Sequence, residues 1–300
     1  MQTTSKLYPF LEYAVQYVLH HANTAAGDGA AQTSFLQEFP LSTWIITNNL
    51  FERHEIRRYT PAAQRMYILA ERNYGMLLEA EIKLHHYVDA RTERYDSPLM
   101  AAIMHEIWRY HAVRAVLLER GADVELRDIY NCTALSYAIE FSQDDAVKQL
   151  LDYGAEVESR GDHGSTPLCQ AARLQYPWAV GSLLDKGANP EPRDDDGRVA
   201  LSYAIEYGRK ATVIQLLDSG ADVNSRDNFG RTPLSYTTER LSGLGAVTIV
   251  QLLLKQGVDL QSTDEDGNTP LDHARRRGIH DVVMVLEKWQ WDRGTMKLKD

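Results

Sequence analysis

The stretch Asp227-Asn-Phe-Gly-Arg-Thr-Pro-Leu234 recurs along the chain, most closely as Asp264-Glu-Asp-Gly-Asn-Thr-Pro-Leu271. Its final leucine recurs with spacings of 36, 33, 33, 33 and 37 residues, at Leu99, Leu135, Leu168, Leu201, Leu234 and Leu271. A second marker, glycine followed by alanine or valine, recurs with spacings of 33, 33, 33 and 37, at Gly121, Gly154, Gly187, Gly220 and Gly257. Two markers with one period indicate an internal structural repeat.

The residues of the repeat predict a pair of helices joined to the next pair by a turn. The threonine of each Thr-Pro can cap a helix start, and the proline suits the first helical position. The glycine before it, as in Gly230, predicts a turn that needs a positive φ, and Asn131 replaces it in one repeat. The glycine of each Gly-Ala dipeptide predicts a left-handed cap that ends the second helix. Paired leucines supply the apolar stripe of that second helix.

These motifs resemble the ankyrin repeat over about residues 94 to 290. The resemblance implies an all-α solenoid of helix pairs with β-hairpin tips, preceded by an N-terminal helical cap. Val199-Ala200 replaces Thr-Pro in one repeat, and Ala134 replaces the proline in another, so we expect weaker helix starts there. The extra residues near 104 to 110 and 241 to 245 are expected between the two helices of their repeats.

We divide the chain at the points where the repeat signal fades. Residues 1–59 predict an N-terminal helical capping segment, and residues 60–92 a degenerate repeat, because Met66 lies 33 residues before Leu99. Residues 93–291 predict about six repeats, with Trp289 and Trp291 covering the last one, and residues 292–300 a C-terminal tail.

Composition narrows the class of protein. The formal net charge is −10 and the pI about 5.5, which argues against nucleic acid as the main partner. No apolar run approaches the length of a membrane span, so no membrane partner is expected. The two cysteines, Cys132 and Cys169, predict no disulfide framework and favour a cytoplasmic, possibly nuclear, location.

Motifs for catalysis are missing from the sequence. No zinc-type cysteine pairs, His-Glu-x-x-His, Gly-x-Ser-x-Gly or dinucleotide fingerprint occurs. The adjacent pairs His20-His21 and His85-His86 diverge by about 100° on a helix, which makes each a poor chelate. We therefore expect no enzyme activity, no cofactor and no metal site.

The ankyrin resemblance implies that the hairpin tips and the exposed side of the first helices form a concave binding surface. Tyrosine and arginine, which are enriched at protein-binding hot spots, recur at these positions. The predicted partner-binding residues are Tyr130, Tyr137, Glu140, Phe141, Arg173, Arg198, Tyr203, Glu206, Tyr207, Phe229, Arg231 and Tyr236. They favour a protein-interaction scaffold whose partner is an unidentified protein.

Other interpretations of the same residues stay open. The tyrosines of Leu-Ser-Tyr are similar to a common fungal variant of the repeat, and Glu140, Arg173 and Glu206 are compatible with an intramolecular ion-pair ladder. The aromatic and acidic surface would also suit a small-molecule-binding or accessory enzymatic protein, if it closed into a pocket. A degenerate fragment without a present partner is a further possibility.

The segment Pro9-Phe-Leu-Glu-Tyr-Ala-Val-Gln-Tyr-Val-Leu-His-His-Ala22 resembles the junction between an NTPase module and ankyrin repeats in fungal NACHT-type signalling proteins. That resemblance implies a sensor arm of an immune-like ATPase. The chain has no Gly-x-x-x-x-Gly-Lys-Ser/Thr loop, so it is not itself the ATPase. It would be either a fragment of such a protein or a stand-alone relative.

Overall fold

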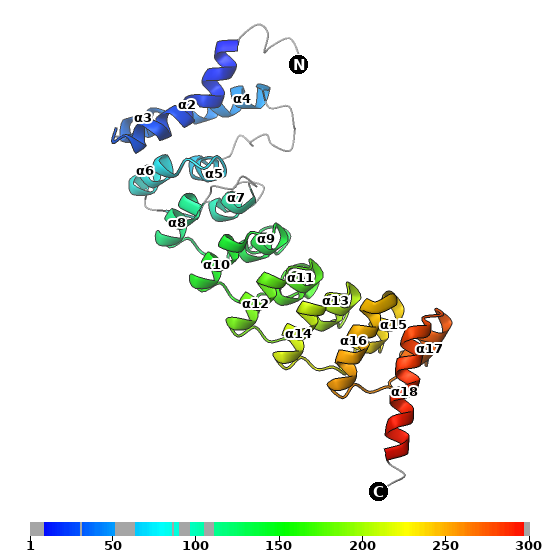
Figure 1. The fold of residues 1–300 in the computed structure, drawn as a ribbon. Coiled ribbons are helices and arrows are strands. Elements are labelled where there is room, and N and C mark those ends of the chain that lie inside the picture. The colour runs from blue at the N-terminus through cyan, green and yellow to red at the C-terminus, as the bar shows by residue number, and fades with distance from the viewer. Residues whose placement is uncertain are drawn as a thin grey trace. The chain divides into compact units, whose positions relative to one another are not determined.

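The structure is a computed structural model that describes residues 9–30, 32–51, 64–85, 87–89, 97–104 and 111–296. Within these ranges the regular structure is helical and no strand occurs. The helices form the predicted all-α solenoid of helix pairs, with N-terminal helices before the repeats (Figure 1). None of the described helices has the length and apolar character needed to cross a membrane.

The chain forms two compact units, which we describe separately. The first unit comprises residues 1–141 with 148–155, and the second comprises 142–147 with 156–300. The helices before the unit boundary are α2 (Pro9–Gly27), α3 (Thr33–Glu38), α4 (Leu41–Phe51), α5 (Arg65–Glu71), α6 (Gly75–His85), α7 (Pro98–Met104), α8 (His111–Glu119) and α9 (Ala134–Glu140). Helix α10 (Asp144–Asp152) contributes residues to both units.

The second unit is built from two layers of helices. The inner helices are α11 (Pro167–Arg173), α13 (Ala200–Glu206), α15 (Pro233–Arg240) and α17 (Pro270–Arg276). The outer helices are α12 (Pro177–Asp185), α14 (Lys210–Asp218), α16 (Gly243–Lys255) and α18 (His280–Met296). Successive inner helices pack side by side, as do successive outer helices, and each inner helix packs on the outer helix that follows it (Figure 1).

The inner helices α11, α13 and α15 bury most of their side chains. All six residues from Ala200 to Ile205 of α13 are buried, and alanines such as Ala204 allow the neighbouring helices to approach closely. A helix such as α13 has a wide apolar surface and no narrow apolar stripe, since it contacts an inner helix on each flank and an outer helix behind. The core of the unit therefore lies between the two layers.

The helix starts follow the predicted capping chemistry. Thr166, Thr232 and Thr269 each accept a hydrogen bond from the backbone N–H three residues on, with proline at the next position. Val199 offers no side-chain cap, as predicted for α13. The expectation for α9 was wrong in part, because Thr133 still caps the helix and only the proline is lost.

The turns that precede the inner helices, residues 161–165, 194–198, 227–231 and 264–268, are here called the tips. Each is closed by two backbone hydrogen bonds, such as Asp227 N to Arg231 O and Gly230 N to Asp227 O, both at 3.1 Å, in place of a regular strand pair. Neighbouring tips are bonded to each other, as Asn228 N is to Asp196 O at 3.0 Å. Gly197 has a φ of 76°, and a Cβ there would lie 2.7 Å from Asn228 N, so the contact between tips requires glycine.

The extra residues near 241 to 245 lie between an inner and an outer helix, as predicted. They lengthen the outer helix, since α16 has 13 residues where α12 and α14 have nine. The other insertion, near 104 to 110, falls almost wholly outside the described residues.

In the first unit, the N-terminal helices pack on the helix pair α5 and α6, which occupies the predicted degenerate repeat. The Trp44 indole donates to the backbone carbonyl of Val15 at 2.8 Å and joins α4 to α2. The Asn23 side chain accepts from the backbone N–H groups of Met76 and Leu77 at 3.0 and 3.2 Å, which caps the start of α6 from α2. These bonds join α2 to α4 and to the start of α6.

At the other end of the second unit, α18 covers the last repeat differently from the prediction. Val282 and Leu286 are buried, Trp289 is half-buried, and Trp291 is 73% exposed. Trp291 therefore does not shield the apolar end of the unit. The helix continues to Met296, so the first part of the predicted tail is helical.

Candidate functional site

In the repeat that contains α15, the tip and the inner helix are joined by one aspartate that uses both carboxylate oxygens. Asp227 Oδ1 accepts the backbone N–H groups of Phe229 and Arg231 at 2.9 and 2.8 Å, which shapes the tip. Its Oδ2 accepts the hydroxyl of Tyr236 at 2.6 Å. The carboxylate therefore fixes the tip against α15.

The same pairing recurs wherever the tip carries an aspartate. The Tyr203 hydroxyl donates to Asp194 at 2.5 Å in the second unit, and Tyr137 donates to Asp128 in the first. In the last tip, His273 Nε2 lies 2.7 Å from Asp264 Oδ2. The equivalent positions of the remaining repeat are Gly161 and Gln170, so this repeat lacks the aspartate and the tyrosine together.

This pairing changes the interpretation of three predicted binding residues. Tyr137, Tyr203 and Tyr236 are only 8%, 9% and 1% exposed. Burial, followed by the hydrogen bond to the aspartate, raises the pKa of all three hydroxyls above the usual value of tyrosine. The three residues present almost no surface to a partner, and their role is to hold the tips in place.

Arginines cover the buried tyrosines in the second unit. The Arg198 guanidinium lies 3.9 Å from the centre of the Tyr203 ring and 4.7 Å from that of Tyr236, and it pairs with Glu206. Arg231 repeats the arrangement one tip further on, 4.9 Å from the centre of the Phe229 ring and 2.8 Å from Asp227 Oδ2. Such cation–π stacks hold the cations over the rings and limit their freedom to reorient.

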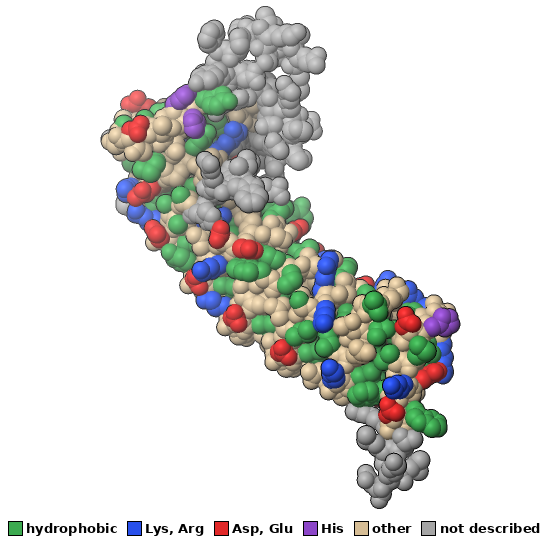
Figure 2. Space-filling view, viewed as in Figure 1, with side chains coloured by type: hydrophobic (Ala, Val, Ile, Leu, Met, Phe, Trp, Pro, Cys, Tyr) green, Lys and Arg blue, Asp and Glu red, His purple; other side chains and the backbone are tan. Residues whose placement is uncertain are grey.

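The side chains that remain exposed are fewer than predicted. In the second unit, Phe229 is 50% and Tyr207 43% exposed, Arg173 is exposed, and Arg198, Glu206 and Arg231 are half-buried. In the first unit, Tyr130 is 64% exposed, Glu140 is exposed, and Phe141 is half-buried with its ring stacked on Tyr137. On the face shown in Figure 2, acidic, basic and hydrophobic side chains alternate along the repeats.

Of the three residues proposed for an ion-pair ladder, Glu140, Arg173 and Glu206, only Glu206 forms ion pairs in the second unit, and its partners are other arginines. Glu206 pairs with Arg198 of the preceding tip and with Arg240, whose Nε lies 3.5 Å away. Glu239 pairs with Arg231 at 3.7 Å in the same way. Because these pairs link a tip to the C-terminal end of an inner helix, the acidic side chains are satisfied within the unit.

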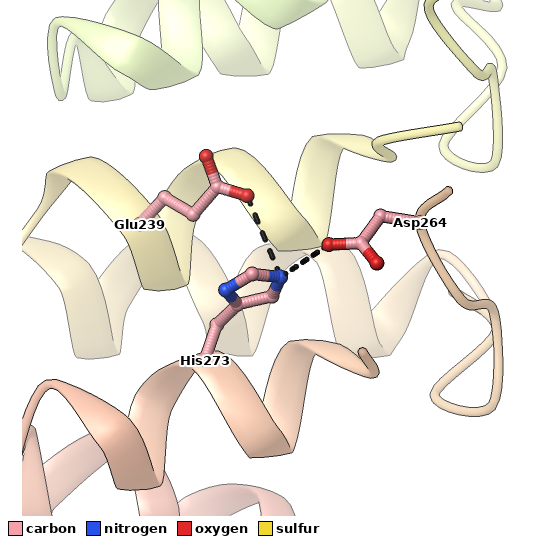
Figure 3. A group of neighbouring side chains, drawn as sticks. All are labelled: Glu239, Asp264 and His273. Carbon is pink, nitrogen blue, oxygen red and sulfur yellow. Dashed lines mark hydrogen bonds and ion pairs between the residues drawn. The ribbon is translucent and has the colours of Figure 1, made fainter. Parts of the chain in front are cut away.

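A group of possible metal ligands escaped the sequence analysis, which expected none. Glu239, Asp264 and His273 lie together although they come from α15, the last tip and α17 (Figure 3). Burial raises the pKa of Asp264, but hydrogen bonds from the Asn268 amide and from His273 outweigh it and hold the pKa below its usual value. No local motif reveals this group, since Glu239 is 34 residues from His273 and belongs to the preceding repeat.

Comparisons with known proteins agree with this architecture. The family model described as ankyrin repeats (3 copies) matches residues 67–161, 118–194, 159–227 and 201–290. No curated protein matches the chain. Among solved structures, the crystal structure of the ankyrin repeat domain of Bcl-3, a member of the IkappaB protein family, is similar with 26% identity and a TM-score of 0.65. The alignment covers 74% of this chain and 98% of that chain. The family matches overlap from residue 67 to residue 290, and the chain belongs to the ankyrin-repeat family.

Proposed function

We propose that this protein is a non-catalytic interaction scaffold that binds a protein partner through its tips and the exposed ends of its inner helices. Ankyrin repeats are generally protein-interaction modules and typically non-catalytic. The observation that carries the proposal is the exposure of Phe229 at a tip, where its ring contacts Arg231, and of Tyr207 at the end of α13, next in sequence to Glu206, which pairs with Arg240. Aromatic and arginine side chains dominate protein-binding hot spots.

The buried network beneath these residues supports the proposal. Asp227 fixes the backbone on both sides of Phe229, through the N–H groups of Phe229 and Arg231. The Phe229 ring contacts the Arg231 guanidinium, which is itself held by Asp227. A contact residue on a backbone that is already ordered loses less conformational freedom when a partner binds, which favours affinity.

The first unit offers a separate surface of the same kind. Ile129 and Tyr130 are 80% and 64% exposed at the turn 128–132, and Asp128 holds the backbone N–H of Tyr130 at 2.9 Å. We therefore assign two sets of partner contacts, one in each unit. Tyr130, Glu140 and Phe141 form the first set, and Arg173, Tyr207, Phe229, Arg231 and Arg240 form the second.

The experiment compares partner capture by the full chain and by two matched variants. Tyr207→Ala with Phe229→Ala removes the exposed aromatics of the second unit, whereas Trp178→Ala removes an aromatic that is 40% exposed on the outer helix α12. We expect proteins captured from a lysate of the source organism to be retained by Trp178→Ala and lost from the double variant. Unchanged circular dichroism and melting temperature show that both variants are folded. Equal capture by all three proteins would contradict the assigned surface.

A second candidate concerns the larger protein in which such a chain would act. The resemblance of residues 9–22 to the junction of fungal NACHT-type signalling proteins supports a role as the recognition arm of an NTPase. The packing of α2 against α6 fits such a junction, because it makes that segment continuous with the repeats. Reconstitution of the chain with a NACHT module, and a partner-dependent change in ATP hydrolysis, tests this candidate. Cys132 and Cys169 are not joined by a disulfide, which fits the proposed cytoplasmic location.

The small-molecule alternative has less support in the second unit. Its candidate groups were Tyr203, Glu206 and Tyr207, but Tyr203 is buried against Asp194 and Glu206 is engaged by two arginines. Polar groups that already satisfy one another are poorly placed to recognise a ligand.

A further inference from the structure

The group formed by Glu239, Asp264 and His273 differs from the corresponding groups of the other repeats in one respect. His273 stands nine residues after Asp264, where Tyr203 and Tyr236 stand nine residues after Asp194 and Asp227. A tyrosine can only donate its hydroxyl proton to the aspartate at neutral pH, whereas a neutral imidazole offers a nitrogen lone pair. With histidine in place of tyrosine, the pair that holds the tip against the inner helix becomes a pair of possible metal ligands, His273 and Asp264.

The third possible ligand comes from the neighbouring repeat. His273 Nε2 lies 2.7 Å from Asp264 Oδ2 and 3.6 Å from Glu239 Oε1, so one nitrogen faces two carboxylates (Figure 3). The three ligand atoms all lie within 4.8 Å of one another. The side chains of Glu239, Asp264 and His273 are 19%, 8% and 12% exposed, so the group is largely shielded from water.

Besides the contact with His273, Asp264 Oδ2 has one longer contact, to the side-chain nitrogen of Asn268 at 3.5 Å, which an ion would replace. Asp264 Oδ1 accepts the backbone N–H of Asn268 at 2.8 Å, which holds the carboxylate in place and leaves Oδ2 toward the histidine. Glu239 Oε2 faces Arg231 at 3.7 Å, which leaves Oε1 toward the same nitrogen. Arg231 is also bound to Asp227, so part of its charge is balanced outside the group.

We propose that Glu239, Asp264 and His273 bind a first-row transition-metal dication of the Zn²⁺ class, with water as the fourth ligand. Bonds of about 2.0–2.2 Å in a tetrahedral site place ligand atoms roughly 3.3 Å apart. The separation of 3.6 Å between His273 and Glu239 already fits, and the 2.7 Å between His273 and Asp264 needs to open by roughly half an ångström. Ca²⁺ and Mg²⁺ prefer six or more oxygen ligands, so an imidazole with two carboxylates favours zinc over either ion.

Binding would join two repeats directly, since the ligands come from α15, the last tip and α17. An ion that binds the folded chain and not the unfolded one raises the melting temperature, by an amount that grows with the logarithm of the free ion concentration once this exceeds Kd. The inference is independent of partner binding, because its readouts require no second protein.

The test uses the full chain without a histidine tag. Zn²⁺ is titrated by calorimetry, and thermal unfolding is followed in EDTA, Zn²⁺ and Mg²⁺. We expect one equivalent of Zn²⁺ to bind and to raise the melting temperature, with no effect of Mg²⁺. The decisive variant is His273→Tyr, which recreates the tyrosine–aspartate pair of the two preceding repeats and should keep the fold. It should lose at least tenfold in Zn²⁺ affinity and lose the Zn²⁺-dependent shift in melting temperature.

Two further variants make each outcome decisive. Glu239→Gln should also weaken Zn²⁺ binding by at least tenfold, and it provides the answer if His273→Tyr fails to fold. His280→Gln removes an exposed histidine at the start of α18 and should bind Zn²⁺ as tightly as the unaltered chain. The proposal is overturned if the unaltered chain takes up no Zn²⁺ at micromolar concentration, or if both ligand variants bind it unchanged. His273 would then serve only as the counterpart of Tyr203 and Tyr236.

Discussion

The hydroxyl of Tyr236 donates to Oδ2 of Asp227 at 2.6 Å, across nine residues that include a complete turn and the start of a helix. Both side chains are buried, at 1% and 0% exposure, so neither can exchange this bond for one with water. The same carboxylate holds two backbone N–H groups of the tip. One aspartate therefore determines the shape of the tip and its position on the inner helix.

Removal of this carboxylate should destabilise the protein more than any exposed change in the same tips. Asp227→Ala leaves two backbone donors and the Tyr236 hydroxyl buried without their acceptor, which we expect to cost about 3–5 kcal/mol of unfolding free energy. Tyr236→Phe should cost about 1–2 kcal/mol, because only one bond is lost. Urea unfolding measures both. Asp196→Ala, at an exposed position of the preceding tip, is the control and should change stability by less than about 0.5 kcal/mol. Similar effects from Asp227→Ala and Asp196→Ala would contradict this account.

Glycine is needed for two separate reasons, at Gly187 after the outer helix α12 and at Gly197 in a tip, and a pair of variants distinguishes them. Gly187 and Gly197 have positive φ angles of 87° and 76°, but only Gly197 has a neighbouring backbone within 3 Å of a new Cβ. Gly187→Ala should cost about 1–2 kcal/mol from backbone strain alone. Gly197→Ala should cost clearly more, because Asn228 must move and its bond to Asp196 O is disturbed. If chemical unfolding gave equal losses of unfolding free energy for both variants, the contact between tips would contribute nothing to stability.

The weakest helix start in the second unit can be improved. Val199 has a φ of −101° and a ψ of 167°, close to the −99° and 166° of the capping residue Thr232. Val199→Thr should therefore raise stability by about 0.5–1 kcal/mol without a change of backbone. The gain is limited because the Ser202 amide already bonds to the Val199 carbonyl at 3.0 Å. The melting temperature measures the gain. Val199→Ala is the comparison variant, because it also removes the valine side chain but adds no capping oxygen. A decrease for Val199→Thr would mean that burial of the hydroxyl outweighs the cap.

Stability should fall at alkaline pH through the buried tyrosines. The pKa values of Tyr203 and Tyr236 are raised in the folded state by burial and by the neighbouring carboxylates, whereas in the unfolded chain they stay near 10. A raised folded-state pKa gives stability that is complete below pH 10 and is lost as the pH rises above it, because only the unfolded chain releases the protons. The melting temperature should therefore decrease between pH 10 and pH 11.5. Tyr236→Phe should have a lower melting temperature at pH 8 and a shallower decrease above pH 10. If the melting temperature of Tyr236→Phe decreased as steeply above pH 10, the alkaline loss of stability would come from groups other than Tyr236.

The sequence by itself determined the features that depend on neighbouring residues. The period, the caps at Thr166, Thr232 and Thr269, and the positive φ at Gly197 and Asn131 all follow from the conformations those residue types favour. Each is a property of a few consecutive residues. The helix pairs could therefore be predicted from the repeat of 33 residues alone.

Only the tertiary structure decided which side chains face a partner. Tyr203 and Tyr207 are alike in type and lie four residues apart, yet Tyr203 is 9% exposed against Asp194 and Tyr207 is 43% exposed. Arg198 shows the same dependence, because it lies between the tyrosine of its own repeat and that of the next. The group of Glu239, Asp264 and His273 also exists only once two repeats are stacked. Exposure and ligand geometry arise from the packing of one repeat on another, and no single repeat contains that information.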